Sequence, residues 1–231
     1  MNADMKIVSM EVNSDSINGY LAHPVSASGP AVLVIQEWWG VVPHIRSVVD
    51  RLAQAGFVAL AVDHYRGIET TEPDEAQKLM MGLKVAAAGA EIAAGAEFLL
   101  ARDDVSSSHV GTVGFCMGGG LSLLAPTVSE AITAAVAFYP AMPWPDYHPD
   151  WTKFAGKTVM IHKAESDEAH AGPRIAEYQR AIESDGGEVI IFDYPNSDHA
   201  FFNDDRPEVF NAEYSLLAWQ RSTEILNKKL R

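Results

Sequence analysis

The chain has 231 residues, of which 48% are hydrophobic and 21% charged, and its formal net charge at pH 7 is −14. This composition excludes an intrinsically disordered protein, and the length predicts a single domain, residues 1–231, whose core needs neither disulfides nor a structural metal. The acidic balance excludes binding to nucleic acid or an anionic membrane through a general basic surface, and it favours a soluble monomer or small homo-oligomer.

Apolar runs typical of strands alternate along the chain with segments of helical period. The strand-like runs are residues 6–12, 19–24, 30–37, 57–63, 109–115, 132–140, 157–163 and 188–195. Helices are predicted over residues 44–56, 73–100 (one or two helices), 117–126 (with Pro126 as its limit), 173–184 and 206–230. The first two runs predict a hairpin. The alternation after them predicts an α/β fold, with a mainly parallel central sheet and helices on both faces.

Two segments bear on where the protein acts. Residues 1–10 lack the basic segment and apolar run of a signal peptide. Residues 82–101 are the most membrane-like, but they include Lys84, Glu91 and Glu97, and their alanines and glycines favour a helix packed closely on a sheet. We therefore expect a cytoplasmic protein that binds neither nucleic acid nor a membrane.

Polar residues that follow the predicted strands are the candidates for chemistry, because parallel sheets bind ligands at the carboxyl ends of their strands. These residues are Glu37, the segment 63–66, Cys116, Tyr139, the segment 163–167, Asp198 and His199.

Cys116 is the only cysteine of the chain and lies in the stretch VGFCMGGG, residues 113–120. Gly114 and Gly118 flank it between a predicted strand and a predicted helix, which fits the G-x-nucleophile-x-G pattern of a sharp strand-to-helix turn. The helix N-terminus favours a thiolate, and the amide of Met117 would point toward a carbonyl oxygen under attack. The alternative is a buried cysteine beside a glycine-rich packing contact.

A cysteine nucleophile needs a base and a residue that orients the base. In a fold of this type the chain order is nucleophile, acid, histidine. Asp167 and His199 follow two later predicted strands in that order. Glu165 and Asp198 are neighbouring alternatives to Asp167, and His199 taken alone would also fit an exposed loop histidine.

Two further histidines, His162 and His170, are not expected to act as the base. His162 lies inside its predicted strand and is expected to be a core histidine with satisfied hydrogen bonds rather than a base. His170 is expected in a loop or at a helix start. A metal site built from His162, Asp167 and His170 matches no recognised ligand motif, and we expect neither a metal nor a cofactor. A single cysteine also excludes an internal disulfide and a C-x-x-C pair.

Glu37 ends the predicted strand 30–37 and is followed by Trp38 and Trp39. The loop after this strand usually supplies the second amide of an oxyanion hole, here that of Trp38. A carboxylate close to Cys116 would disfavour the thiolate form of the cysteine. The alternative is a helix-capping or solvent-facing glutamate.

Together these features resemble the dienelactone hydrolase family (carboxymethylenebutenolidases) of the α/β-hydrolases. The matching stretches lie between residues 34 and 221 and read VIQEWWG, AVDHYRG, GFCMGGG, HKAESDE and DHAFFNDDRPEVFNAEYSLLAWQR. The resemblance implies an α/β-hydrolase fold with Cys116 as nucleophile, His199 as base and Asp167 as the residue that orients the base.

The resemblance also implies roles around the nucleophile. Glu37 would accept a hydrogen bond from the resting thiol of Cys116 and swing away when substrate arrives. The amides of Trp38 and Met117 would form the oxyanion hole.

The sequence departs from the family at the arginines that hold the substrate carboxylate. Asn203 takes the position four residues after the candidate histidine, and residues 69–81 contain no arginine. Arg66 and Arg206 lie nearby in the sequence without occupying a matching position, and Arg206 is expected to tie down the C-terminal segment. Dienelactone itself is therefore not the expected substrate.

The sequence predicts a hydrolase that cleaves a carboxylic ester or lactone of a small molecule through a cysteine acyl-enzyme. Its substrate pocket is expected to include Trp39, Arg66, Phe115, Tyr139, Trp144 and Phe201, several of which would equally fit the core. Two alternatives remain: a thioesterase or xenobiotic esterase that uses the same triad, and a non-catalytic small-molecule-binding protein with a hydrolase fold.

Overall fold

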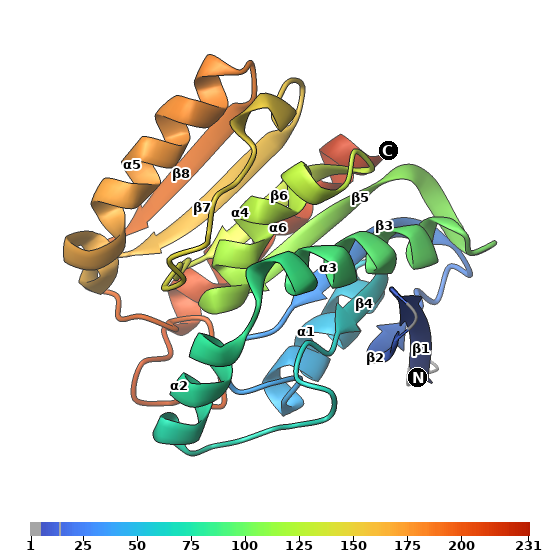
Figure 1. Cartoon of the computed structure of the whole chain (residues 1–231), viewed down its shortest axis with the longest axis horizontal. Coiled ribbons are helices and arrows are strands. Elements are labelled where there is room, and N and C mark those ends of the chain that lie inside the picture. The colour runs from blue at the N-terminus through green and yellow to red at the C-terminus, as the bar shows by residue number, and fades with distance from the viewer. Residues whose placement is uncertain (1–5, 14) are drawn as a thin grey trace.

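The structure is a computed structural model and describes residues 6–13 and 15–231. These residues form an eight-stranded sheet with the strand order β1-β2-β4-β3-β5-β6-β7-β8. Figure 1 shows helices on both sides of the sheet. Residues 1–5, which begin the segment predicted to lack a signal peptide, lie outside the described residues.

The strands are β1 (Lys6–Val12), β2 (Asp15–Ala22), β3 (Gly29–Ile35), β4 (Val58–Val62), β5 (Val105–Phe115), β6 (Ile132–Phe138), β7 (Thr158–Ala164) and β8 (Glu188–Tyr194). The helices are α1 (Pro43–Gln54), α2 (Pro73–Gly82), α3 (Val85–Leu100), α4 (Met117–Val128), α5 (Glu168–Ser184) and α6 (Ala212–Leu230). Two short 3-10 helices are η1 (Trp151–Lys153) and η2 (Glu165–Asp167).

The strand pairing confirms the predicted hairpin and the mainly parallel sheet. β1 pairs with β2 and β2 with β4 in antiparallel fashion. The pairings from β4 through β3, β5, β6 and β7 to β8 are parallel. Every residue of β3 and β4 is buried, as expected for strands covered on both faces. The segments that follow β3, β4, β5, β7 and β8 therefore gather at one edge of the sheet.

Several helix boundaries differ from the predicted ones. α4 continues past Pro126 to Val128, because the burial of its first ten residues outweighs the single hydrogen bond that a proline removes. α5 begins at Glu168 and includes Pro173. α6 begins at Ala212, where the side chain of Asn211 caps the helix by accepting the Tyr214 N–H at 3.0 Å.

The helices form two layers, each with its own apolar cluster against the sheet. α3, α4 and α5 cover one face, and α1 and α6 cover the other (Figure 1). α3 approaches the sheet so closely that a Cβ atom at Gly95 would lie 2.9 Å from Val62 Cγ2 and 3.0 Å from Leu33 Cδ2. This contact confirms that the segment 82–101 packs on the sheet.

Among the described residues, no single helix is long and apolar enough to cross a membrane. α2 and α3 meet the criteria of length and composition only as a pair, and the two helices are bent by 84° at the break between them.

We expect Gly95→Ala to lower the free energy of unfolding by about 1–3 kcal/mol, because the new methyl group would overpack a filled interface. Urea denaturation followed by circular dichroism tests this. Gly82→Ala, at the end of α2, is the matched control, since a Cβ atom there meets nothing within 4 Å. The control should be neutral or stabilising. Equal stability of the two variants would contradict the close approach of α3.

His162 lies in β7 with its side chain completely buried. Its Nδ1 atom is 2.8 Å from the hydroxyl of Tyr194, and its Nε2 atom is 2.9 Å from the hydroxyl of Ser222. Burial, together with the nearby charge of Arg221, lowers the pKa of His162 to about 3. The ring is therefore neutral in the folded protein, which confirms the predicted core histidine.

This lowered pKa makes stability depend on pH. Because the unfolded chain binds the proton of His162 near pH 6.5 and the folded protein only near pH 3, stability falls as the pH drops through this interval. We expect His162 to account for about 2 kcal/mol of lost stability between pH 7 and pH 5. Urea unfolding at both pH values should show this loss in the wild type and a correspondingly smaller loss in His162→Phe. An NMR titration of the wild type that placed the His162 pKa near 6 would refute the expectation.

Candidate active site

Cys116 stands at a sharp turn between β5 and α4. Its backbone dihedrals are φ 54° and ψ −117°, in a region that residues with side chains rarely adopt. Its N–H donates to the carbonyl of Phe138 at 3.1 Å, and its own carbonyl accepts the N–H groups of Gly120 at 3.1 Å and Ala141 at 2.8 Å. The turn is therefore fixed from both sides.

The flanking glycines make this turn possible. A Cβ atom at Gly114 would lie 1.9 Å from the carbonyl oxygen of Gly118. A Cβ atom at Gly118 would lie 2.3 Å from the carbonyl oxygen of Ile35, at the end of β3. The first turn of α4 thus contacts backbone directly, and the only cysteine of the chain sits where these elements meet.

His199 and Asp167 meet beside this turn. The Nδ1 atom of His199 lies 2.9 Å from Asp167 Oδ2 and 3.0 Å from Oδ1. The backbone N–H of His199 donates to the hydroxyl of Ser166 at 2.8 Å, which fixes the loop after β8 to η2. The charge of Cys116 acts electrostatically on His199. Asp167 and His199 therefore form a hydrogen-bonded pair within electrostatic reach of Cys116.

The neighbouring acids have other partners. The carboxylate of Glu165 accepts the backbone N–H of Asn196 at 2.5 Å. Asp198 forms a turn in which its carbonyl accepts the N–H of Phe201. His170 lies exposed in the first turns of α5. Of these acids, Asp167 is the one whose carboxylate contacts the ring of His199.

The protonation of His199 is set by opposing effects. Burial lowers the pKa of His199, but the negative charge of Cys116 and the hydrogen bonds to Asp167 and Cys116 outweigh it, so the pKa lies well above its usual value.

Glu37 is almost completely buried directly after β3. Its Oε1 atom accepts the hydroxyl of Tyr139 at 3.3 Å, and its Oε2 atom accepts the side-chain amide of Asn203 at 2.8 Å. In this conformation Tyr139 and Asn203 are the hydrogen-bond partners of the Glu37 carboxylate. The role of Glu37 as a thiol-holding acid therefore stays a prediction, whereas the capping and solvent-facing alternatives do not fit its burial.

Two backbone amides lie directly after Glu37 and directly after Cys116 in the chain. Within the described part of the chain, the N–H groups of Trp38 and Met117 have no hydrogen-bond acceptor. Trp38 follows Glu37 in a tight turn closed by the Gly40 N–H, which donates to the Glu37 carbonyl at 3.2 Å. Met117 begins α4. Both amides are thus free to donate to a bound oxygen.

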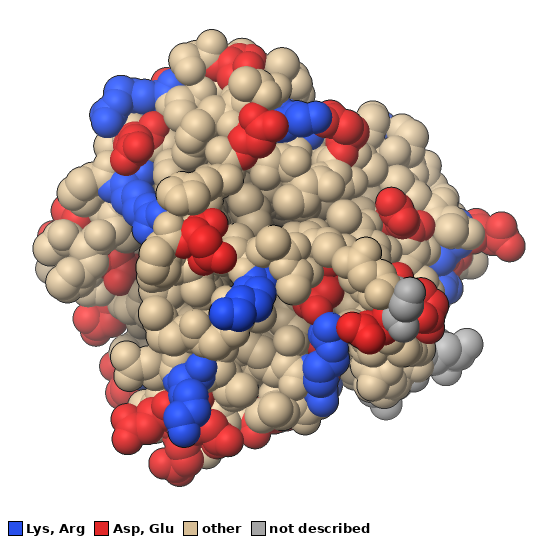
Figure 2. All heavy atoms as spheres, viewed as in Figure 1, with Lys and Arg blue, Asp and Glu red and all other residues tan. Residues whose placement is uncertain are grey.

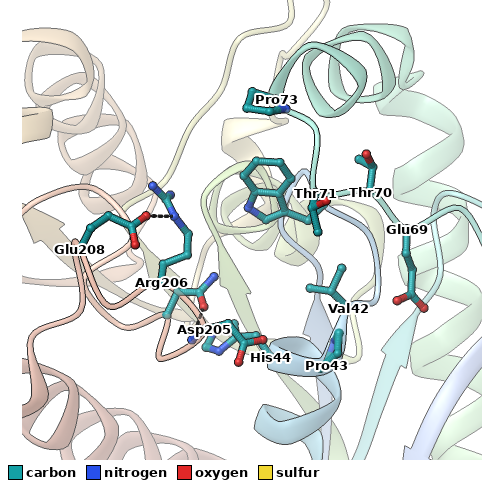
Figure 3. A pocket seen from close by; sticks show the side chains of 12 residues that line it. Val42, Pro43, His44, Glu69, Thr70, Thr71, Pro73, Asp205, Arg206 and Glu208 are labelled. Carbon is teal, nitrogen blue, oxygen red and sulfur yellow. Dashed lines mark hydrogen bonds and ion pairs between the residues drawn. The ribbon is translucent and has the colours of Figure 1, made fainter.

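A cavity of about 670 Å³ is lined in part by Asn203, the hydrogen-bond partner of Glu37. Its lining comes from the loop after β3 and the start of α1, from the loop before α2, and from the loop after His199: Trp39, Val42, Pro43, His44, Glu69, Thr70, Thr71, Pro73, Asn203, Asp205, Arg206 and Glu208. Figure 3 shows Arg206 and Glu208 across the cavity from Thr70 and Glu69. Asn203 joins this cavity to the site, since the same side chain holds the carboxylate of Glu37.

The residues predicted to line a pocket divide into two groups. Trp39 lines the cavity. Phe115, Tyr139 and Phe201 are completely buried among other aromatic rings, and Trp144 donates its indole N–H to the carbonyl of Met80 at 2.7 Å. None of these four residues lines the cavity, but Tyr139 lies at the site, since its hydroxyl contacts Glu37 and its ring centroid is 5.0 Å from that of His199.

The two arginines predicted near the site, Arg66 and Arg206, also differ in their contacts. Arg66 donates to Glu91 at 2.6 Å and does not line the cavity. The carbonyl of Arg206 accepts the N–H groups of Val209 and Phe210, which fits the predicted role in tying down the C-terminal segment. Its side chain also lines the cavity, where its Nε donates to Glu208 at 2.8 Å.

Sequence reasoning missed the pair formed by His44 and Asp204. His44 Nδ1 lies 2.9 Å from Asp204 Oδ1, and the buried Nε2 atom has no partner among the described residues. No local sequence pattern predicts this pair, because the two residues are 160 positions apart.

The surface in Figure 2 shows basic side chains separated by acidic and uncharged ones, without a continuous basic area on this face. This distribution agrees with the formal net charge of −14.

Comparisons with known proteins show the family to which the chain belongs. A model of the dienelactone hydrolase family matches residues 17–230. Protein usf of Aquifex pyrophilus is 31% identical over 236 residues, which cover 97% of this chain and 99% of that protein. A solved structure from Klebsiella pneumoniae, assigned to the dienelactone hydrolases, is 25% identical with a TM-score of 0.84 over 97% of this chain and 98% of its own. The chain belongs to the dienelactone hydrolase family and has the α/β-hydrolase fold.

Proposed function

We propose that this protein cleaves a carboxylic ester or lactone of a small molecule through a covalent intermediate on Cys116. The observation that carries the proposal is the strained strand-to-helix turn at Cys116 together with the His199–Asp167 pair, on which the charge of Cys116 acts. A binding protein would have no need of an oriented base beside a cysteine in a strained backbone conformation.

The first half of the proposed reaction forms an acyl-enzyme. The sulfur of Cys116 attacks the carbonyl carbon, a carbon–sulfur bond forms, and the carbonyl electron pair moves to the oxygen. The amides of Trp38 and Met117 stabilise this oxygen, and such a donor is worth about 3–4 kcal/mol in related acyl transfer. His199, which holds the proton that Cys116 gives up, delivers it to the leaving oxygen as the ester bond breaks.

The second half releases the acid. His199, now neutral, removes a proton from water, and the resulting nucleophile attacks the thioester carbon. The carbon–sulfur bond then breaks, and the thiolate returns to its place beside the imidazolium. Asp167 keeps Nδ1 of His199 in its donor role throughout, so that Nε2 faces the reacting atoms.

The cavity lined in part by Asn203 is the proposed binding place for the substrate. Its only lining arginine, Arg206, is already paired with Glu208, so an anionic substrate would have to compete with that carboxylate. The chemistry draws on side chains and backbone amides alone. We propose that the enzyme acts in the cytoplasm as a single domain, alone or in a small homo-oligomer.

Cys116→Ala should abolish turnover of an activated aryl ester and of a five-membered enol lactone, because no acyl-enzyme can form without the sulfur. Mass spectrometry of the quenched wild type should detect the acyl group on Cys116. Equal turnover by wild type and variant would overturn the proposed nucleophile. A wild type that binds small carboxylates but cleaves no activated ester would favour a binding function instead.

Asp167→Asn should reduce kcat by roughly 10²- to 10⁴-fold, because the orienting acceptor of His199 is lost. Asp198→Asn is the matched control, since it makes the same change beside His199 at an acid without a role in orienting the ring, and it should retain kcat within about threefold. Similar losses in both variants would show that the acid has been misassigned.

Glu37→Gln tests the proposed influence of the buried carboxylate on the sulfur. Because both Glu37 and Cys116 act electrostatically on Tyr139, the two groups share one environment, and loss of the Glu37 charge should favour the thiolate. The midpoint of the pH profile of iodoacetamide alkylation should therefore move to lower pH by roughly one pH unit. Glu130→Gln, an exposed acid before β6, is the control with the same change in charge. An alkylation profile that is identical in wild type and Glu37→Gln would count against this role.

A further inference from the structure

The turn after β4 contains Tyr65, whose hydroxyl contacts Met117, the residue after Cys116. The carboxylate of Asp63 accepts the N–H of Tyr65 at 3.0 Å and that of Gly67 at 2.5 Å. Arg66 and Gly67 have φ values of 56° and 86°, so the chain reverses immediately after Tyr65. The backbone of Tyr65 is thereby fixed by local bonds.

A second set of bonds ties this turn to the sheet and to α3. The N–H of His64 donates to the side-chain oxygen of Gln36 at 3.1 Å, directly before Glu37. His64 and Arg66 both bond the buried carboxylate of Glu91 on α3, at 2.5 and 2.6 Å. These bonds fix the residues on both sides of Tyr65.

The hydroxyl of Tyr65 is buried against a poor acceptor. Tyr65 is 5% exposed, and its hydroxyl donates to the thioether sulfur of Met117 at 3.1 Å. Thioether sulfur accepts hydrogen bonds only weakly. Two other buried tyrosines donate to oxygen: Tyr147 to the Gly120 carbonyl at 2.6 Å and Tyr139 to Glu37 at 3.3 Å. Tyr65 thus has a strong donor whose bonding capacity is not used in the resting site.

The same hydroxyl lies within electrostatic reach of the proposed nucleophile. Burial and then the charge of Cys116 raise the pKa of Tyr65, so the hydroxyl keeps its proton. Met117, its present partner, follows Cys116 and supplies one of the two amides proposed to bind the carbonyl oxygen.

We propose that the hydroxyl of Tyr65 is a third donor to the oxyanion that forms when Cys116 attacks an ester. As the carbonyl electron pair moves to oxygen, rotation about the Cζ–O bond turns the hydroxyl hydrogen from the Met117 sulfur to that oxygen. The proton stays on Tyr65, and a weak bond is exchanged for a charge-assisted one. This inference rests on the proposed function of Cys116.

Tyr65→Phe removes the donor and keeps the ring. We expect kcat for an activated aryl ester to fall roughly 10- to 100-fold, with KM within about threefold of wild type, because the lost bond forms only in the transition state. Alkylation of Cys116 by iodoacetamide should keep its wild-type rate and pH profile, since that displacement forms no oxyanion. Tyr147→Phe, which also loses a buried hydroxyl bond, is the control and should lose stability but retain its kcat.

The outcomes separate this inference from the function on which it rests. Equal turnover by wild type and Cys116→Ala would refute the nucleophile itself. An inactive Cys116→Ala beside a fully active Tyr65→Phe would refute the role of Tyr65 alone. If Tyr65→Phe lowered the turnover and the alkylation rate to the same extent, Tyr65 would only support the strand-to-helix turn at Cys116, and the inference would be overturned.

A measurement on the wild type tests the contact without any variant. A trifluoromethyl ketone forms a tetrahedral adduct on a thiolate and so places a negative oxygen in the proposed hole. The ¹³Cζ resonance of Tyr65 in tyrosine-labelled protein should shift when the adduct forms. An unchanged resonance in a fully formed adduct would overturn the proposed bond.

Discussion

The candidate site depends on contacts in which backbone meets backbone with no side chain between. The first turn of α4 lies against the ends of three neighbouring segments: Gly118 against the carbonyl of Ile35, Gly119 against that of Phe138, and Gly120 against that of Ala141. A Cβ atom at any of these glycines would lie 2.2–2.7 Å from the oxygen it faces. The site exists because α4 can begin this close to the sheet. Its N-terminal amides then face the same space as the loops after β3 and β6.

This close approach also gives the site its electrostatic character. The carboxylate of Glu37 is buried among neutral donors, a hydroxyl from Tyr139 and an amide from Asn203. Neither donor cancels its charge, so the field of Glu37 acts on its surroundings, as the raised pKa of Tyr139, caused by burial and then by Glu37, indicates. An arginine at position 203, which the family resemblance led us to look for, would neutralise Glu37. With asparagine there, the hydrogen bond is kept and the negative charge remains.

Much of this arrangement could be predicted from the sequence, because it follows local rules. Buried strands read as apolar runs, and the spacing of Gly114, Cys116 and Gly118 follows from what a strand-to-helix reversal can accommodate. The order of Asp167 and His199 along the chain then follows from the topology of the sheet. The start of α6 was less predictable, because a turn at Arg206–Phe210 precedes the cap at Asn211.

The direction of the aromatic side chains and the cavity could not be predicted. Phe115 and Phe201 lie next to site residues in the sequence, yet their rings point into the core. The cavity joins three loops that no local pattern relates, and the bond between Glu37 and Asn203 spans 166 positions. Arg66 looked available from sequence alone, because its partner, Glu91, belongs to a distant helix. These features depend on packing between distant segments rather than on local order.

The single cysteine of the chain affects how oxidation of its thiol can be reversed. If Cys116 is oxidised to a sulfenic acid, the chain offers no second thiol to resolve it as an internal disulfide. Repair then needs a small thiol that can reach the sulfur, and Cys116 is only 9% exposed at the bottom of its turn. The same burial that limits access for oxidants therefore limits access for the reductant that would reverse the damage.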